Sequence, residues 1–244
     1  MPSPSYQERR SQVEAYFDRT AAETWKRLTS DAPVSGIRAT VRAGRDEMRA
    51  TLLGWLPADL AGKTLLDAGC GTGMLALEAA RRGAQVHAVD LSPTLVENAR
   101  ERVPAELADR IVFSVGDMLA PGQQGDGRGD HPGEGASFDY VVSMDSVIHY
   151  ERDDALGVIA GLAGRARERL LFTFAPRTLL LSLMHGVGQF FPRSDRSPAI
   201  VPVAERRLRR GIEGEPALAR WRIGRTRLVQ RGFYTSQAME LTAS

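Results

Sequence analysis

The chain has 244 residues and a mass of 26.6 kDa, a length that suits one α/β domain with embellishments. Its 43% hydrophobic and 25% charged residues are average for globular proteins, which argues against a disordered, collagen-like or membrane-spanning chain. The formal net charge of +2 is too small for a dedicated nucleic-acid-binding surface. All cations except Lys26 and Lys63 are Arg, which prefers planar anions such as carboxylates and phosphates.

The single cysteine, Cys70, excludes an internal disulfide and a multi-cysteine metal site, and it fits a reducing compartment. The amino-terminal stretch has no apolar core of the signal-peptide type. No apolar run approaches the roughly 20 residues that a membrane span needs. We therefore expect a cytoplasmic protein that is soluble or peripheral to a membrane.

Two helices are expected before the first strand. Apolar side chains recur at spacings of three and four over residues 5–30, which predicts an amphipathic helix with one face formed by Val13, Tyr16, Phe17, Ala21, Thr24, Trp25 and Leu28. A second helix is expected over residues 35–56, ahead of Pro57. Neither segment carries residues suited to catalysis, so we expect residues 1–58 to form a helical cap.

From Lys63 onward, short apolar strands alternate with helices, which is the pattern of parallel βαβ units. Strands are expected at TLLDAG, AQVHAVDLS, IVFSVGDM, FDYVVSMD, RLLFTFAP, ARWRIGRTRLVQ and GFYTSQAMEL, with a helix over residues 153–164. This predicts an α/β fold over residues 59–244, with a Rossmann-like, mostly parallel seven-stranded sheet flanked by helices. Residues 121–136 are expected to form a flexible loop, and residues 177–215 an insertion that covers the substrate.

The most informative stretch is DAGCGTG at residues 67–73, where a strand runs into a glycine turn and then into a helix. Glycines there permit unusual backbone angles and let a ligand approach the chain closely. The dinucleotide fingerprint G-x-G-x-x-G would need a glycine where Met74 stands. The pattern therefore favours a ligand that has no pyrophosphate.

Acidic residues close the next two predicted strands. Asp90 follows the glycine turn by about twenty residues, where a carboxylate can bind the vicinal hydroxyls of a ribose. Asp117 and Met118 close the third strand, where an adenine ring would lie. The alternatives are that Asp90 caps the next helix, for which Ser92-Pro93 is better suited, that Asp117 is a turn residue, and that Met118 is a core residue.

The acid-x-G-x-G-x-G turn and the following acid resemble those of the class I S-adenosylmethionine-dependent methyltransferases, over about residues 60–175. The resemblance implies the Rossmann-like methyltransferase fold. It further implies that the glycine turn passes under the methionine part of the donor, that Asp90 binds the ribose, and that Asp117 and Met118 hold the adenine. The expected donor-binding set is Asp67, Gly69, Cys70, Gly71, Gly73, Asp90, Leu91, Asp117, Met118 and Met144.

Further motifs narrow the resemblance. VEAYFDRTAAETWKRL, VRAGRDEM, MDSVIHY, FFPRSDRSP and RGFY are together similar to the magnesium-protoporphyrin IX O-methyltransferases, which esterify one propionate of the macrocycle in chlorophyll and bacteriochlorophyll synthesis. The resemblance implies S-adenosyl-L-methionine as co-substrate and magnesium carried by the porphyrin, with no metal bound by the protein. The expected substrate-binding residues are Tyr16, Trp25, Tyr150, Phe190, Arg193 and Arg196. A magnesium chelatase subunit and the surface of the photosynthetic membrane are the partners that this function suggests.

His149 is the expected acid–base residue, because it stands just beyond the fourth strand, where class I methyltransferases present groups to the acceptor. A propionate is already ionised at neutral pH, so His149 either orients the carboxylate or accepts its proton. His185, in the apolar helix expected over residues 179–191, is a candidate axial ligand for the porphyrin magnesium. That helix either packs on the edge of the sheet or covers the porphyrin.

Two other functions stay open. A methyltransferase for a quinone or another small apolar molecule would share the donor half of the chain, and so would a non-catalytic protein that binds the donor. Nucleic-acid methyltransferases are disfavoured. Residues 144–147, MDSV, stand where amino methyltransferases carry an Asn/Asp-Pro-Pro-aromatic tetrad, and Cys70 is not part of the Pro-Cys nucleophile motif of cytosine C5 enzymes.

Overall fold

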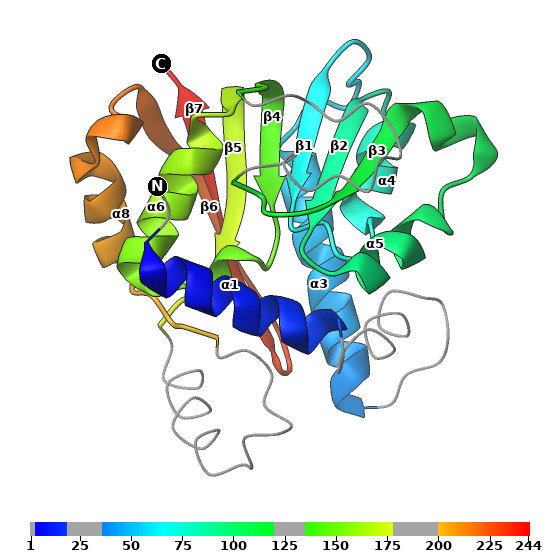
Figure 1. Ribbon diagram of the computed structural model, residues 1–244. Coiled ribbons are helices and arrows are strands. Elements are labelled where there is room, and N and C mark those ends of the chain that lie inside the picture. Colours follow the sequence, from blue (N-terminus) through cyan, green and yellow to red (C-terminus); the bar gives the residue numbers. More distant parts are fainter. Residues whose placement is uncertain (1–2, 19–35, 120–134, 178–199) are drawn as a thin grey trace.

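A seven-stranded sheet forms the centre of the molecule in the computed structural model, which describes residues 3–18, 36–119, 135–177 and 200–244. The strand order is β3-β2-β1-β4-β5-β7-β6 (Figure 1). β1 to β5 are parallel, and β7 is antiparallel to both of its neighbours. The strands are β1 (Thr64–Ala68), β2 (Gln85–Asp90), β3 (Ile111–Val115), β4 (Phe138–Ser143), β5 (Ala166–Phe174), β6 (Trp221–Arg231) and β7 (Tyr234–Ala243). The predicted mostly parallel sheet is confirmed.

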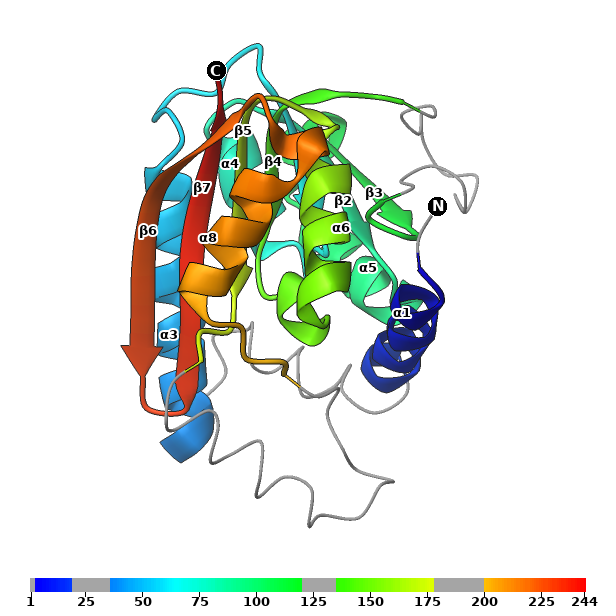
Figure 2. The same cartoon turned by 90° about the vertical axis from the view of Figure 1, so that its left-hand side faces the viewer.

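Helices cover both faces of this sheet, as Figure 2 shows with α3 and α1 on opposite sides. One hydrophobic core lies under α3 (Gly36–Gly54), α4 (Met74–Arg81) and α5 (Pro93–Arg100). The second lies under α1 (Pro4–Tyr16), α6 (Arg152–Ala163) and α8 (Glu205–Gly214). Short 3-10 turns complete the layers: η2 (Ala105–Arg110), η3 (Val147–His149) and η5 (Pro216–Leu218). Over the described ranges, no helix is long and apolar enough to cross a membrane.

The helices expected over residues 35–56 and 153–164 are confirmed as α3 and α6. Of the first expected helix, the described part is α1, in which Tyr6 is buried. The expected loop 121–136 and the expected helix 179–191 lie almost wholly outside the described residues. At the end of the expected insertion, α8 buries Leu208 and Ile212 in the core beside α6. This helix therefore covers the sheet.

The carboxyl ends of the parallel strands meet at one edge of the sheet, and α1 crosses that edge (Figure 1). β1 lies between β2 and β4, so the chain order reverses there. In open α/β sheets, ligands bind at this reversal, outside the carboxyl ends of the strands. The fold thereby brings the glycine turn after β1 next to the segment that follows β4.

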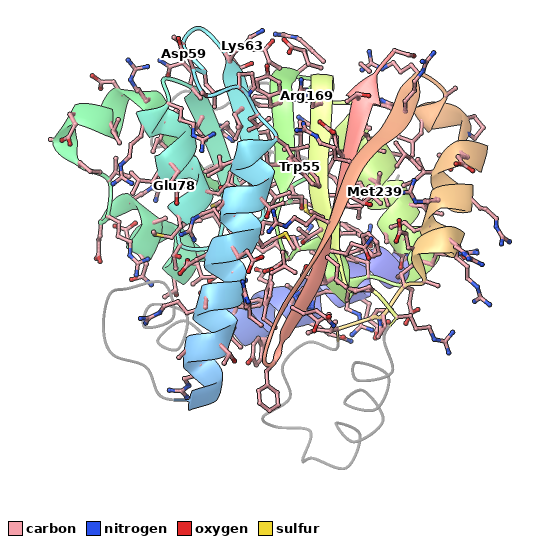
Figure 3. All side chains as sticks on the ribbon, turned by 180° about the vertical axis from the view of Figure 1, so that it is seen from behind. Trp55, Asp59, Lys63, Glu78, Arg169 and Met239 are labelled. Atoms are coloured by element: carbon pink, nitrogen blue, oxygen red, sulfur yellow. The ribbon has the colours of Figure 1, made fainter. Side chains whose placement is uncertain are left out.

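α3 packs against the antiparallel end of the sheet, where it contacts β6 and β7, and the view from behind shows it in front of the sheet (Figure 3). Near its carboxyl end, the carbonyl of Trp55 accepts hydrogen bonds from Arg169 and Arg225. In its middle, Gly44 lies against the ring of Tyr234, so closely that a Cβ at position 44 would stand 2.4 Å from Cδ1 of that ring. A glycine inside a helix usually costs about 1 kcal/mol relative to alanine. Here the missing side chain makes room for Tyr234.

We expect Gly44→Ala to lower the free energy of unfolding by about 1–3 kcal/mol, because the new methyl group overpacks the contact with Tyr234. The matched control is Gly54→Ala, at the end of the same helix, where a Cβ would meet nothing within 4 Å. This control should be neutral or slightly stabilising. Chemical denaturation of both variants measures the difference, and equal stabilities would show that the Tyr234 contact does not constrain position 44.

Candidate active site

A cavity of about 360 Å³ opens at the carboxyl ends of β1 and β4, within the range of small-molecule sites. Its walls come from α1, α3, the glycine turn, the ends of β2 and β3, the segment after β4, and the β6–β7 hairpin. Segments from most of the described chain therefore converge on one hollow. The predicted donor and acceptor residues can be placed against it.

The glycine turn after β1 forms a backbone cradle on this cavity. Gly69 and Gly71 have φ angles of 81° and 54°, in the left-handed region that favours glycine. A Cβ on Gly69 would lie 1.9 Å from Oγ of Ser146, whereas a Cβ on Gly71 would meet nothing within 4 Å. Gly71 thus leaves open space beside the backbone, and its N–H donates to Oδ2 of Asp90 at 2.8 Å. The cradle fits a ligand that runs along the chain.

Asp90 ends β2 and holds the cradle in shape. Besides the bond from Gly71, its Oδ1 accepts a hydrogen bond from the N–H of Ser92 at 3.0 Å, and burial raises the pKa of its carboxyl. Capping of α5 falls to Ser92, whose Oγ accepts from the N–H of Leu95, with Pro93 opening the helix. The capping alternative for Asp90 is therefore wrong, and its carboxylate lines the cavity.

Asp117 stands at the end of β3, where α1 crosses it. Its Oδ1 accepts from the hydroxyl of Tyr6 at 2.7 Å and from the N–H of Leu119 at 2.9 Å, and its Oδ2 lies 3.3 Å from Nη1 of Arg10. Tyr6 stacks on Tyr150, with ring centroids 4.9 Å apart. Sequence reasoning missed Tyr6, because no motif marks it and its partner lies 111 residues away.

His149 lies on the cavity wall among aromatic residues. Its imidazole is 6% exposed and meets the ring of Phe17 edge-on, with centroids 6.0 Å apart. Tyr16 and Tyr150 line the same cavity. The N–H of Val201 donates to the carbonyl of Ile148 at 2.8 Å, which ties the segment before α8 to the turn that holds His149. A buried imidazole beside apolar rings suits a group that meets an acceptor away from water.

Most of the predicted site residues in the described ranges line this cavity: Tyr16, Gly69, Gly71, Asp90, Leu91, Asp117, Met118, Met144, His149 and Tyr150. Met118 is also buried in the core. Asp67, Cys70 and Gly73 are not among the lining residues. Trp25, His185, Phe190, Arg193 and Arg196 lie outside the described residues. Arg45 and Asp145, which sequence reasoning did not select, line the cavity as well.

Asp67 lies behind the glycine turn. Its carboxylate is 1% exposed and accepts a hydrogen bond from the N–H of Ala76 at 3.1 Å, so it joins β1 to the first turn of α4. Burial raises the pKa of Asp67 to about 7, an increase to which the charge of Asp90 adds and which the Ala76 hydrogen bond opposes. The carboxyl therefore changes its charge near neutral pH.

The raised pKa of Asp67 predicts a pH-dependent stability. An unfolded Asp titrates near pH 4, so the native state holds one extra proton between about pH 4 and pH 7. Stability from this group is therefore lost as the pH rises through that window. Asp67→Asn should remove this component, so that the melting temperature of the wild type falls relative to that of the variant between pH 4 and pH 7.

The control for this measurement is Asp59→Asn, an exposed carboxylate that also accepts a backbone N–H, from Ala61 at 2.8 Å. Its melting temperature should run parallel to that of the wild type over the same range. If Asp67→Asn also ran parallel to the wild type, the carboxyl of Asp67 would not titrate in this window.

Comparisons with known proteins find methyltransferases. Residues 65–167 match a family described as "Methyltransferase domain", and residues 143–243 match "Magnesium-protoporphyrin IX methyltransferase C-terminus". The ubiquinone biosynthesis O-methyltransferase of Xanthomonas oryzae pv. oryzae is 36% identical over 54% of this chain and 49% of its own length. The geranyl diphosphate C-methyltransferase of Streptomyces coelicolor shares the fold, with a TM-score of 0.65 at 13% identity over the full length of both chains.

Other relatives match over almost the whole chain. The magnesium-protoporphyrin O-methyltransferase of Rhodobacter capsulatus is 46% identical over 98% of this chain and 99% of its own length. That of Synechocystis is 30% identical over 95% of both. A crystal structure of the Synechocystis magnesium protoporphyrin IX methyltransferase with bound SAH has a TM-score of 0.79 and 29% identity, covering 96% of this chain and 99% of that one. The chain belongs to the magnesium-protoporphyrin O-methyltransferase family.

Proposed function

We propose that the chain transfers the methyl group of S-adenosyl-L-methionine to a propionate carboxylate of magnesium protoporphyrin IX. The products are the monomethyl ester and S-adenosyl-L-homocysteine, and the reaction belongs to chlorophyll or bacteriochlorophyll biosynthesis. The observation that carries this proposal is the 46% identity to the Rhodobacter capsulatus magnesium-protoporphyrin O-methyltransferase over 99% of its length. The cavity supports it, because acidic residues, a glycine cradle and His149 with aromatic residues all line one hollow.

The donor side of the cavity fits S-adenosyl-L-methionine, which when bound supplies a methyl group on a positively charged sulfur. The open backbone at Gly71 leaves room for the methionine part. Asp90 then accepts hydrogen bonds from the ribose hydroxyls, and Asp117 and Met118 contact the adenine. Because Asp117 also accepts from Tyr6, α1 closes over the adenine end of this site.

On the acceptor side, a carboxylate oxygen displaces the sulfur from the methyl carbon in line, and the sulfur leaves as a neutral thioether. A propionate is already ionised at neutral pH, so the residues need not generate the nucleophile. The rate then comes from alignment and from removal of water around the carboxylate. We propose that His149 orients the carboxylate and that the aromatic residues around it exclude water.

His149→Gln separates orientation from general-base catalysis. If His149 orients an ionised carboxylate, glutamine keeps part of the function, the loss of kcat stays well below a thousandfold, and wild-type kcat is nearly flat from pH 6 to pH 8. Loss of a general base costs about 10²- to 10⁴-fold. The measurement is kcat against pH with saturating donor, and the affinity for S-adenosyl-L-homocysteine is the control for an intact donor site. A larger loss, together with disappearance of an ionisation near neutrality, would establish the base.

The proposed activity is tested by transfer of a labelled methyl group to magnesium protoporphyrin IX. Esterification of one propionate supports the proposal. Turnover of a quinone without turnover of the porphyrin would favour a methyltransferase for small apolar molecules. Donor binding without any turnover would favour a non-catalytic protein that binds the donor. The match to the ubiquinone enzyme covers 54% of this chain, whereas the match to the Rhodobacter capsulatus porphyrin enzyme covers 98%.

We also propose two partners for substrate delivery. Magnesium protoporphyrin is a large apolar ring, which suits transfer by direct contact with a magnesium chelatase subunit or with the surface of the photosynthetic membrane. Cosedimentation with vesicles of anionic lipid and with the chelatase subunit tests each contact separately. Retention by neither would remove both partners from the proposal.

A further inference from the structure

Among the residues that the structure describes, acids outnumber cations on the cavity wall, which matters for an anionic acceptor. The acidic residues that line the cavity are Glu14, Asp90, Asp117 and Asp145. Within the described ranges, Arg45 is the lining residue with a permanent positive charge. A carboxylate that enters a hollow with so many acids needs a cation to offset its loss of hydration. Arg45 is placed to supply that charge.

Arg45 is held by a buried carboxylate. Its Nη1 donates to Oδ2 of Asp145 at 2.7 Å, and the side chains are 21% and 7% exposed. Asp145 has a φ of 56°, which is uncommon for a residue other than glycine. Such a backbone persists where surrounding contacts fix it, and it is frequent at functional sites. The pair therefore stands on a turn that the fold holds firmly.

Hydroxyl groups from two neighbouring strands complete the surroundings of Asp145. Its carboxylate accepts from the hydroxyl of Tyr234 at 3.1 Å, from Ser236 at 3.1 Å and from Thr173 at 3.2 Å. Burial raises the pKa of the Tyr234 phenol, so this group stays protonated and donates. These bonds stabilise the charge of Asp145 independently of Arg45. A guanidinium has five N–H donors in one plane, so it can serve Asp145 and a second carboxylate at once.

This cluster joins three of the motifs that carry the family resemblance. Arg45 belongs to VRAGRDEM, Asp145 to MDSVIHY and Tyr234 to RGFY. Gly44 leaves room for the ring of Tyr234 against α3, and Val41, one helical turn before Arg45, lines the same cavity. His149 itself belongs to MDSVIHY, but Arg45, Asp145 and Tyr234 have no part in the proposed donor site or in the proposed action of His149. Their meeting point on the cavity wall therefore needs a function of its own.

We propose that Arg45 binds a propionate carboxylate of the porphyrin and so sets the position of the ring in the cavity. This inference rests on the proposed function, from which it takes the substrate. It assigns to α3 the cation that orients the substrate, while Asp145 holds the guanidinium toward the cavity. The carboxylate is either the one that reacts or its neighbour on the macrocycle, and the experiment below separates the two.

The test is Arg45→Met, with binding measured by quenching of intrinsic fluorescence. The ligands are magnesium protoporphyrin IX, its monomethyl ester and its dimethyl ester. Loss of a charge-assisted hydrogen bond should weaken binding of the diacid about 10- to 100-fold. An equal loss for the monomethyl ester places Arg45 on the neighbouring carboxylate, whereas an unchanged monomethyl ester places it on the reacting one. Binding of the dimethyl ester and of S-adenosyl-L-homocysteine should not change.

Arg49→Met is the matched control. Arg49 lies one turn further along α3, pairs with Asp46 and Glu78, and is not among the residues that line the cavity. Its affinity for all three porphyrins should equal that of the wild type. Arg45→Lys keeps the charge but not the planar fork, so it should recover part of the affinity for the diacid. Its affinities for the dimethyl ester and for S-adenosyl-L-homocysteine should equal those of the wild type.

Three results would overturn the inference: wild-type protein that binds diacid and dimethyl ester equally, an Arg45→Met variant with unchanged affinity for the diacid, or one that loses all three porphyrins equally. The last would show a purely structural role for Arg45. Failure of the proposed function is recognised separately, because the wild-type protein would then not methylate magnesium protoporphyrin IX, whatever its affinities for the three porphyrins. Turnover of the wild type is therefore measured alongside.

Discussion

The contact between Gly69 and Ser146 is the constraint on which the site depends. A Cβ at position 69 would collide with Oγ of Ser146 at 1.9 Å. The turn after β1 and the turn after β4 are therefore in close contact, with the Ser146 hydroxyl packed against the backbone of Gly69. The first turn belongs to the donor side and the second leads to His149. Methyl transfer requires the donor and acceptor atoms to be aligned at about 3–3.5 Å. The reversal of strand order between β1 and β4 provides that proximity.

Charge is distributed to suit both ligands of the proposed reaction. Asp90 and Asp117 are tied to backbone N–H groups and so present acceptors to the hydroxyls and amine of a nucleoside. Asp145 also lines the cavity and is paired with Arg45 at 2.7 Å. A negatively charged acceptor near Asp145 therefore meets a carboxylate that is already paired. The positive sulfur of the donor adds to this attraction during the reaction.

Local patterns in the sequence predicted the parts of the site that one βαβ unit builds. The alternation of strands and helices located the sheet. The glycine turn, Asp90 and Asp117 were predicted at the carboxyl ends of three strands, and the structure has them there on the cavity wall. Contacts between distant elements left no such signal. Tyr6 and Asp117 are 111 residues apart, and Arg45 and Asp145 are 100 apart. Asp67 was expected among the donor-binding residues; it lies buried within β1, outside the cavity lining, and accepts a hydrogen bond from the N–H of Ala76.

α1 contacts both sides of the cavity. Tyr6 reaches Asp117 and Tyr150, and Phe17, just after the helix, reaches His149. At about 1.5 Å of rise per residue, a helix separates the Cα atoms of these two residues by roughly 16 Å along its axis. One element thus contacts both Asp117 and His149. Because closing an active site expels water from it, an element that contacts both residues suits the proposed reaction.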